Sequence, residues 1–270
     1  MSTTIDHIGV AGCGAMGLPM AERLLGAGLR VSGFDVRPLS EFGEFAEHMD
    51  ASVNVLRQCD CVISVVRDAA ETDALCFSDQ ALFAARPYPR LLVVSSTLSP
   101  RTIGALRERL PDDVELVDAP MSGAPHRARE GTLTFMAGGD TDTIARLQSA
   151  LEAMGNTVFH LGPLGAGMTI KVLNNYVAAS SVAATRRSMQ LAQKAGVDPA
   201  LLHQVMRASS GANWYVDNFD SIDWGREGYA PNNTIGILEK DVQCALDIET
   251  DELQPADEAL LQALRRLHAI

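Results

Sequence analysis

Short apolar runs alternate with amphipathic stretches over the first half of the chain. The runs are rich in Val, Ile and Leu, as in strands that are buried on both faces of a sheet. We predict strands at residues 5–11, 30–34, 61–66, 91–95, 114–117, 132–136 and 158–161. Apolar residues between them recur at helical spacing, which predicts helices at residues 18–25, 72–83, 100–109 and 141–154. This alternation predicts a parallel, doubly wound sheet that binds ligands at the carboxyl ends of its strands.

The pattern changes after Gly162 and Pro163, where we expect a hinge. No Gly or Pro occurs from Met168 to Ala195, and Gly196 then supplies a residue that ends helices. This stretch predicts one helix of roughly 40 Å at ~1.5 Å per residue. Its apolar residues lie on nearly every side, so we expect most of it to be buried. Further helices are predicted at residues 199–208, 214–219, 235–247 and 256–267. We therefore expect two domains, an α/β domain at residues 1–163 and an all-helical domain at residues 164–270.

A G-x-G-x-x-G sequence follows the first predicted strand and opens a helix. In this context Gly12 makes a tight turn, Gly14 lets the backbone approach a pyrophosphate, and Gly17 lets the helix pack on the strand. The N–H groups around Ala15 and Met16 would face the phosphates at the start of the helix. The motif together with its context predicts a dinucleotide-binding site.

Asp35 follows the second predicted strand, where the adenosine ribose of such a cofactor lies. A carboxylate there accepts hydrogen bonds from the ribose hydroxyls and repels a 2′-phosphate, which favours NAD over NADP by an expected 100-fold or more, about 3 kcal/mol. Arg37 opposes this preference, since an arginine can pair with that phosphate.

Lysine is rare in this chain, because of the 22 basic residues only Lys171, Lys194 and Lys240 are lysines. Lys171 stands near the start of the long predicted helix, on one face with Asn174 and Asn175. An ammonium can lose its proton when it is buried, whereas arginine cannot. Lys171 is therefore either a proton-transferring residue or an ordinary lysine at a helix end, and the count leaves both readings open. Lys240 precedes Asp241, and the sequence alone favours an exposed ion pair over a functional role for these two residues.

Composition narrows the classes of function. The chain of 270 residues is 47% hydrophobic and 21% charged, as in soluble globular proteins. Its net charge of −12 argues against nucleic acid and anionic membranes as partners. The 5 cysteines show neither CxxC spacing nor a histidine at ligand spacing, so we expect no metal site, and reduced thiols in the cytoplasm.

Residues 118–123, which read DAPMSG, stand at the end of a predicted strand. Ser122 offers a hydroxyl, and Gly123 allows close approach to backbone N–H groups, so the loop could hold a carboxylate. A simple Ser/Gly turn explains the same residues without any ligand. His126 is an alternative acid/base, although a lone loop histidine is more often solvated. Arg127 and Arg129 are either surface charges or attract an acidic substrate.

These stretches together resemble the β-hydroxyacid dehydrogenase family, whose members include 3-hydroxyisobutyrate, tartronate-semialdehyde and 6-phosphogluconate dehydrogenases. The resemblance rests on residues 12–21, 118–123 with 131–133, 165–175, and 240–247. It implies a Rossmann-type N-terminal domain, a long interdomain helix and an all-α C-terminal domain. The chain departs from the family pattern at Ala124 and Arg127, where the family usually has glycine, and at residues 65–68, which match the cofactor-contact loop only approximately.

The resemblance implies that Lys171 is the catalytic acid/base and that Asn175 orients the substrate. It places the substrate carboxylate against Ser122 and Gly123, near Ala124 and Asn174. It implies cofactor contacts from Val65, Val66, Thr97 and Lys240. The predicted protein is thus an NAD-dependent oxidoreductase acting on a small 3-hydroxy acid or its semialdehyde.

Three alternatives stay open. An imine reductase shares this fold, but such relatives commonly place another residue where Lys171 stands. A module that binds NAD without turnover, or a purely structural protein, would need neither Lys171 nor Asn175. We also expect a homodimer or higher oligomer through the helical domain, because nothing follows the last predicted helix to cover its apolar face. That face consists of Leu260, Leu261, Leu264 and Leu267.

Overall fold

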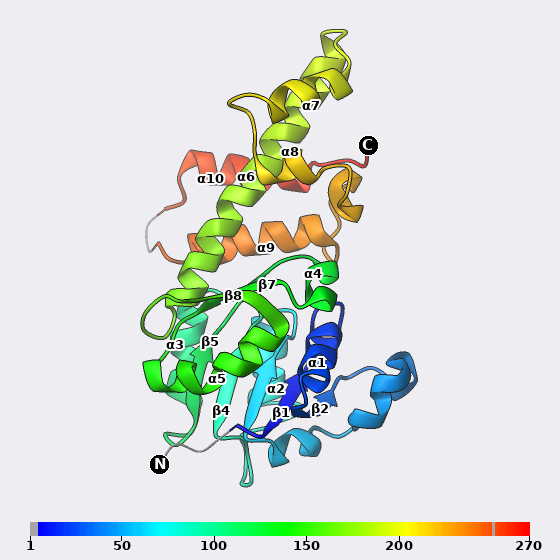
Figure 1. The fold of residues 1–270 in the computed structure, drawn as a ribbon. Coiled ribbons are helices and arrows are strands. Elements are labelled where there is room, and N and C mark those ends of the chain that lie inside the picture. Colours follow the sequence, from blue (N-terminus) through cyan, green and yellow to red (C-terminus); the bar gives the residue numbers. More distant parts are fainter. Residues whose placement is uncertain (1–4, 250–251) are drawn as a thin grey trace. The chain divides into compact units, whose positions relative to one another are not determined.

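Five parallel strands form the central sheet in the computed structural model, which describes residues 5–249 and 252–270. They lie in the order β2-β1-β3-β4-β5 (Figure 1). Their bounds are β1 (His7–Ala11), β2 (Arg30–Phe34), β3 (Cys61–Ser64), β4 (Leu91–Val94) and β5 (Glu115–Asp118). Each strand overlaps the range that the sequence predicts, and the predicted parallel sheet is confirmed. The chain folds as two compact units, the first ending at Lys171 and the second beginning at Val172.

Helices cover both faces of this sheet. They are α1 (Gly17–Gly26), α2 (Ala69–Cys76), α3 (Pro100–Arg109) and α5 (Thr141–Met154). Ile8 and Val10 pack in one cluster with residues of α1 and α5, whereas Val62 and Leu92 belong to a second cluster with residues of α2 and α3. Alternate residues of each strand thus face opposite layers, which is why the strands read as continuous apolar runs.

A smaller sheet extends the first unit. It contains β6 (Met121–Ser122), β7 (Leu133–Ala137) and β8 (Gly155–His160), with β6 antiparallel and β8 parallel to β7. The sequence predicts strands at the positions of β7 and β8, but it does not separate them from the main sheet. Strand β6 has only two residues, too few for any periodic pattern. The short α4 (Pro125–Glu130) connects β6 with β7.

One local prediction needs correction in the first unit. Helix α2 ends at Cys76 rather than near residue 83, because Phe77 leaves the helical conformation and the chain then turns through Ala81 at a φ of 47°. The connection from β2 to β3 lacks an α-helix within the described residues. It consists of three 3₁₀ helices, η1 (Leu39–Glu41), η2 (Gly43–His48) and η3 (Val53–Gln58).

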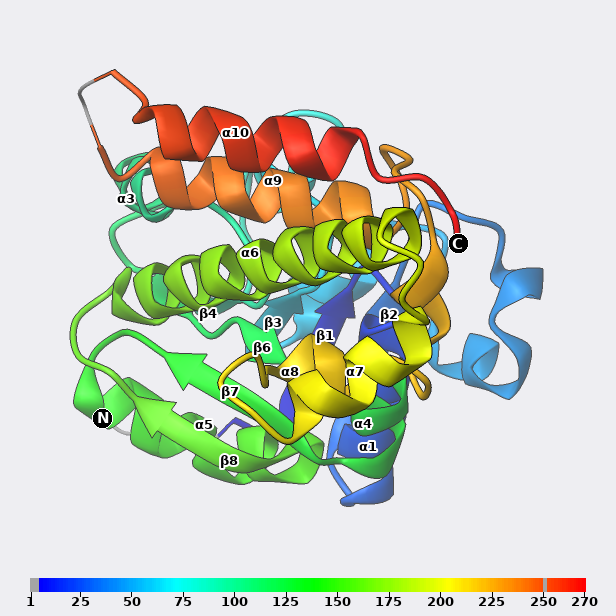
Figure 2. The same ribbon diagram turned by 90° about the horizontal axis from the view of Figure 1, so that it is seen from above.

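Helix α6 (Ala166–Lys194) crosses the division between the units, and every later element belongs to the second unit. These elements are α7 (Pro199–Arg207), α8 (Trp214–Asn218), η4 (Asp223–Arg226), α9 (Thr234–Leu246) and α10 (Pro255–Arg265). Helices α9 and α10 lie side by side (Figures 1 and 2). The predicted all-helical C-terminal region is confirmed. None of the helices in the described residues is long and apolar enough to cross a membrane.

Two burial predictions are wrong. The leucine face of α10 is covered, because it packs into the core of the second unit with residues of α6, α8 and α9. Its four leucines are at most 9% exposed. Helix α6 is less buried than expected, since apolar side chains along it remain about half exposed, namely Ile170, Leu173, Val177 and Leu191.

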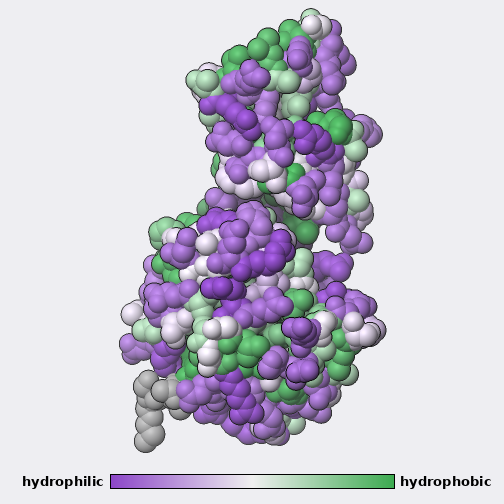
Figure 3. Space-filling view, turned by 45° about the vertical axis from the view of Figure 1, so that its right-hand side comes forward, coloured by the Kyte–Doolittle hydropathy of each residue, from purple (hydrophilic) through white to green (hydrophobic). Residues whose placement is uncertain are grey.

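Exposed apolar side chains gather instead at the end of α6 and on α7. Leu191, Val197, Leu201 and Val205 are each between 45% and 55% exposed. Figure 3 shows hydrophobic surface at the end of the second unit that these elements form. This group of four residues is called the α6–α7 patch below.

A buried arginine holds the C-terminal segment of the second unit. Arg186 on α6 is 1% exposed, and its Nη1 donates to the carbonyl oxygens of Gly225 and Glu227 at 3.0 Å each. Its Nη2 donates to the carbonyl oxygen of His268. Backbone carbonyl oxygens thus accept hydrogen bonds from a guanidinium charge that would otherwise be costly to bury.

Candidate functional site

The glycine-rich turn after β1 has the backbone geometry that its sequence predicts. Gly12 has a φ of 88°, and its N–H donates to Phe34 O at 2.9 Å. A Cβ on Gly17 would lie 1.9 Å from the carbonyl oxygen of Gly12, so α1 packs directly on the turn. A Cβ on Gly14 would meet no atom of the described residues within 4 Å. The turn and packing roles are therefore confirmed, and the open side at Gly14 is where a ligand can approach.

A surface depression of about 300 Å³ lies beside this turn. Gly14 and Ala15 line it together with Arg37 and Arg129. Helix α1 begins at this place, and its N-cap residue, Met16, contributes no side-chain cap in the described structure. Backbone N–H groups at a helix start and two guanidinium groups suit a ligand that carries phosphates. These residues fit a bound dinucleotide.

The cysteine inside the turn is not a reactive group. Cys13 is 1% exposed, and burial raises the pKa of its thiol to about 12. A thiol with so high a pKa carries almost no thiolate near neutral pH and behaves as a small core residue.

Asp35 and Arg37 form an ion pair at the edge of this depression. Arg37 Nε lies 3.0 Å from Asp35 Oδ1, and Nη2 lies 3.1 Å from Oδ2. The Arg37 backbone N–H also donates to Oδ1 at 3.0 Å, and Nη2 donates to Cys13 O at 3.0 Å. Burial alone would raise the pKa of Asp35, but its bonds to Arg37 outweigh burial and hold that pKa below its usual value. The carboxylate predicted to select the cofactor is therefore charged and already paired.

The carboxyl ends of neighbouring strands meet beside the turn. The Val65 N–H donates to Ala11 O at 2.8 Å, and a Cβ on Gly12 would lie 2.8 Å from Val65 O. The Ser96 hydroxyl donates to Val66 O at 2.6 Å, and Thr97 follows it, half-buried. The predicted cofactor contacts of the first unit thus lie along one edge of the sheet, where open parallel sheets bind ligands.

The predicted substrate loop is built on a glycine that no other residue can replace without strain. Gly123 has a φ of 139°, and a Cβ there would lie 2.8 Å from Leu133 Cδ2 and 3.2 Å from Arg127 Cβ. Ser122 pairs with β7, and Ala124 is the N-cap residue of α4. The aliphatic part of Arg127 packs beside the glycine. His126 is exposed, as expected of a solvated loop histidine.

Asp118 joins this loop to the start of α6. Its side chain is 0% exposed, Oδ1 accepts the N–H of Gly165 at 2.6 Å, and Oδ2 accepts the N–H of Met168 at 2.6 Å. Burial raises the pKa of Asp118 to about 6, although these backbone N–H groups favour its charged form. Lys171 follows Met168 on the helix and is 7% exposed.

In the second unit, Asp241 on α9 holds Asn175 of α6. Asn175 Nδ2 donates to Asp241 Oδ2 at 2.6 Å, and Lys240 Nζ lies 2.9 Å from Asp241 Oδ1. Asn174 Nδ2 donates to Asn175 Oδ1 at 3.2 Å. The predicted pair of Lys240 and Asp241 exists, but its predicted exposure is wrong for the acid. Asp241 is 2% exposed because its carboxylate turns towards α6.

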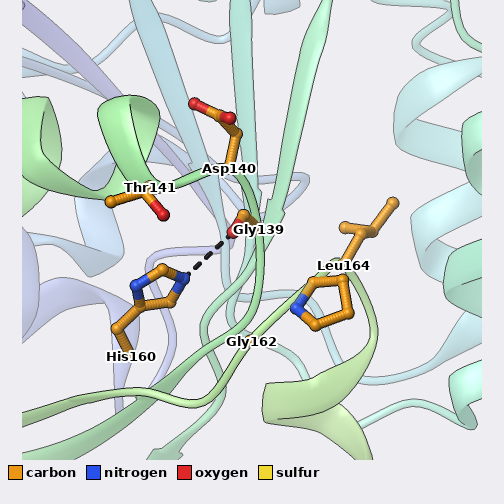
Figure 4. Close-up of a pocket in the computed structure, with 7 residues that line it drawn as sticks. Gly139, Asp140, Thr141, His160, Gly162 and Leu164 are labelled. Carbon is orange, nitrogen blue, oxygen red and sulfur yellow. Dashed lines mark hydrogen bonds between the residues drawn. The ribbon is translucent and has the colours of Figure 1, made fainter.

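A second depression, of about 390 Å³, lies between β8 and the start of α5 (Figure 4). His160 Nε2 lies 3.0 Å from Gly139 O, while the Asp140 carboxylate points away from the histidine (Figure 4). No lysine, arginine or cysteine of the described residues lines it. We therefore assign no role in binding or catalysis to this depression. Elsewhere in the described ranges, no group of three or more His, Cys, Asp or Glu side chains is arranged to hold a metal ion.

Two family models cover most of the chain. The "NAD binding domain of 6-phosphogluconate dehydrogenase" matches residues 7–162. The "NAD-binding of NADP-dependent 3-hydroxyisobutyrate dehydrogenase" domain matches residues 165–261. The chain belongs to the β-hydroxyacid dehydrogenase family. It therefore carries the NAD(P)-binding domains of a family of oxidoreductases.

Individual β-hydroxyacid dehydrogenases resemble the chain over almost its whole length. It is 34% identical to 3-hydroxyisobutyrate dehydrogenase of Pseudomonas aeruginosa, over 98% of this chain and 93% of that protein. It is also 34% identical to L-threonate dehydrogenase of Cupriavidus necator, over 89% of this chain and 82% of that protein. The solved structure of Mycobacterium tuberculosis 3-hydroxyisobutyrate dehydrogenase with L-serine superposes with a TM-score of 0.78 at 29% identity, covering 96% of this chain and 92% of that one.

An imine reductase from Myxococcus stipitatus superposes with a TM-score of 0.63 at 16% identity, covering 98% of this chain and 93% of that one. At that identity the likeness shows only that the two chains share a fold.

Sequence reasoning missed two acids of this chain. The sequence indicates no role for Asp118 within residues 118–123, and it predicts that Asp241 is half of an exposed ion pair. A signal for Asp118 was available, because an acid that directly ends a buried strand must find donors. Nothing in the spacing indicates that these donors belong to Gly165 and Met168.

Proposed function

We propose that this protein is an NAD(H)-dependent oxidoreductase that acts on the hydroxyl of a small 3-hydroxy acid, or on the carbonyl of its semialdehyde. The observation that carries the proposal is that Lys171 is buried, at 7% exposed. It lies one turn after the start of α6, where the N–H of Met168 donates to Asp118. The loop after Asp118 continues into Ser122 and Gly123. A buried lysine on a helix whose first turn is bonded to the strand end before a loop that can hold a carboxylate is suited to proton transfer.

In the proposed reaction, Ser122 and the backbone at Gly123 bind the substrate carboxylate. Lys171, as the neutral amine, accepts the proton of the hydroxyl, and in the reverse direction its ammonium returns that proton to the carbonyl oxygen. Asn175, one turn further along α6, orients the reacting group, with Asn174 beside it. NAD, when bound, supplies the nicotinamide that accepts the hydride.

The residues proposed to hold the cofactor are the glycine-rich turn, Asp35, Val65, Val66, Thr97 and Lys240. We propose NAD as the preferred cofactor, because a charged Asp35 repels a 2′-phosphate and can accept a bond from a 2′-hydroxyl. The ion pair with Arg37 weakens this preference without reversing it, since the hydroxyl bond is lost with NADP whatever Arg37 does.

The names of the relatives support the substrate class. 3-Hydroxyisobutyrate, L-threonate and L-serine, named for three of them, each carry a carboxylate and a hydroxyl on the third carbon. This shared chemistry matches one carboxylate-binding loop and one acid/base residue. The proposal therefore names a small 3-hydroxy acid and leaves its side chain open.

We also propose that the protein forms a homodimer or higher oligomer through its helical domain. The α6–α7 patch is an exposed apolar surface of the kind that marks interfaces. We place the interface at this patch because the leucine face of α10, where the sequence predicted it, is buried.

All five cysteines are unpaired, which suits a reducing compartment such as the cytoplasm.

Substitution of Lys171 tests the proposed function. A panel of 3-hydroxy acids and semialdehydes, followed at the nicotinamide absorbance band, first identifies a substrate. Lys171→Ala should then lower kcat by several orders of magnitude while NADH still binds, and Lys171→Arg should be nearly as inactive because a guanidinium does not deprotonate. Lys194→Ala, at the exposed end of the same helix, is the matched control and should keep full activity. Substantial turnover by Lys171→Ala would refute the assignment.

A further inference from the structure

The carboxylate of Asp118 makes a helix cap of an unusual kind. The first N–H groups of a helix have no partner within the helix and are commonly met by the residue just before it. At α6 they are met instead by Asp118, which is 47 residues before Gly165 and 50 before Met168. Both bonds measure 2.6 Å, as expected for charge-assisted bonds. The cap therefore joins two segments that are far apart in the sequence.

The backbone around Asp118 is packed too closely for any side chain. A Cβ on Gly138 would lie 2.5 Å from Asp118 Oδ1, and a Cβ on Gly167 would lie 2.1 Å from Met136 O. The N–H of Asp118 itself donates to Gly138 O at 3.1 Å. Two glycines thus let the first turn of α6 sit directly against β5 and β7, which leaves that turn little freedom to shift.

Other helices of the chain show that stability alone does not require this arrangement. Asp140 caps α5 from the adjacent position, where its Oδ1 accepts the N–H groups of Asp142 and Thr143 at 3.0 and 3.1 Å. Ser99 caps α3 in the same local way without a charge. Asp118 is instead fully buried, and burial raises its pKa to about 6, so its charged form is maintained at a cost.

We propose that Asp118 is the positioning residue of the acid/base lysine, holding the first turn of α6 in a fixed place relative to the Ser122–Gly123 loop. Lys171 lies three residues after Met168, about one helical turn. Ser122 lies four residues after Asp118 on the continuous loop. One carboxylate thereby sets the distance between the proton acceptor and the group that holds the substrate. The inference rests on the proposed function, in which Lys171 transfers the proton.

Asp118→Asn tests this role, because the amide can accept from one N–H group but turns a donor towards the other. We expect kcat to fall by 10- to 100-fold, the effect of a displacement of about 1 Å at reacting groups. The affinity for NADH, measured by nicotinamide fluorescence, should stay within twofold, since the glycine-rich turn is untouched. Asp140→Ala is the matched control, a lost helix cap in the same unit, and should lower Tm by a few degrees with kcat within twofold.

A double variant separates positioning from general damage. In a Lys171→Ala background, Asp118→Asn should cause no further loss of turnover, because the group that it positions is gone. A further loss of tenfold or more would show that Asp118 acts independently of the lysine and would overturn the inference. So would a kcat within twofold of the unmodified enzyme in Asp118→Asn alone.

Hydrogen exchange of the unmodified protein tests the anchor even if Asp118→Asn fails to fold. The amides of Gly165 and Met168 should exchange at least 100-fold more slowly than in an unstructured peptide. Exchange at the unstructured rate would mean that the anchor does not hold, and the inference would be wrong. If Asp118→Asn keeps kcat while Lys171→Ala loses it, only the positioning role fails. If Lys171→Ala keeps its turnover, the proposed function fails first.

Discussion

The ion pair of Asp35 and Arg37 leads to a quantitative prediction about cofactor choice. A carboxylate has about four acceptor positions, and Arg37 already uses three of those on Asp35 through two side-chain bonds and its own N–H. NAD would contribute a bond from the ribose to the charged carboxylate, worth about 1.5–3 kcal/mol, and NADP would lose it. Repulsion of the 2′-phosphate is offset by the adjacent guanidinium. We therefore expect kcat/KM to favour NAD by at least tenfold, less than the 100-fold expected of an unpaired acid.

Arg37→Gln isolates the contribution of the guanidinium. Without it, the phosphate of NADP meets an uncompensated carboxylate, so the preference for NAD should rise to 100-fold or more, about 3 kcal/mol. Asp35→Ser, with Arg37 left to meet the phosphate, should shift the preference towards NADP. The measurement is kcat/KM for both cofactors at a fixed, saturating concentration of substrate.

Arg109→Gln provides the matched control. Arg109 pairs with Asp73 and lies over the Phe77 ring at 4.0 Å, much as Arg37 pairs with Asp35 and lies over Phe42 at 4.7 Å. Its loss should leave the ratio of the two cofactors unchanged. Equal kcat/KM for NAD and NADP in the unmodified protein would refute the reasoning, because Arg37 would then govern the site. An unchanged ratio in Arg37→Gln would show that the guanidinium does not face the 2′ position.

Three further predictions concern stability and assembly. Burial raises the pKa of Asp118 from its usual value of 3.8 to about 6 in the folded protein. The folded protein therefore retains a proton that the unfolded chain releases between these pH values. The stability of the unmodified protein relative to Asp118→Asn should therefore fall by about 3 kcal/mol as pH rises from 4 to 7, and urea unfolding that gives a constant difference would contradict this. Gly167→Ala should destabilise the first unit by several kcal/mol, because its Cβ would lie 2.1 Å from a backbone oxygen; an unchanged Tm would disprove the close packing. Light scattering should give a dimer or larger at micromolar concentration and a smaller species for Val205→Asp in the α6–α7 patch, whereas a monomeric unmodified protein would rule out the oligomer.

The sequence is most informative where a single segment sets its own structure. The strands of the main sheet are buried on both faces, so their apolar runs mark them directly. The glycine-rich turn is marked by its own motif, because Gly12 needs its positive φ and Gly17 its close approach to Gly12. Helix α6 is marked by its length and by the absence of Gly and Pro after Gly167.

The features that sequence reasoning missed depend on partners far along the chain. Asp118 finds its donors at Gly165 and Met168, and no periodicity links a strand end to a later helix start. The leucine face of α10 is covered by elements that precede it, so its position at the end of the chain was a poor guide to exposure. Apolar residues all around α6 did not reveal which face a neighbour covers. The pairing of Asp35 with Arg37 is local, but the sequence allowed the arginine to face either the acid or a phosphate.

The buried Arg186 limits how the protein can be shortened or fused for study. One of its acceptors is the carbonyl oxygen of His268, two residues before Ile270. A version cut after Leu267 would leave a charged N–H group buried without an acceptor, at a cost of about 1–3 kcal/mol or more. It would also remove the bond from the Ile270 N–H to Arg226 O at 3.0 Å. A purification tag should therefore be added beyond Ile270 or placed at the other terminus, and the final residues should be kept in any trimmed version.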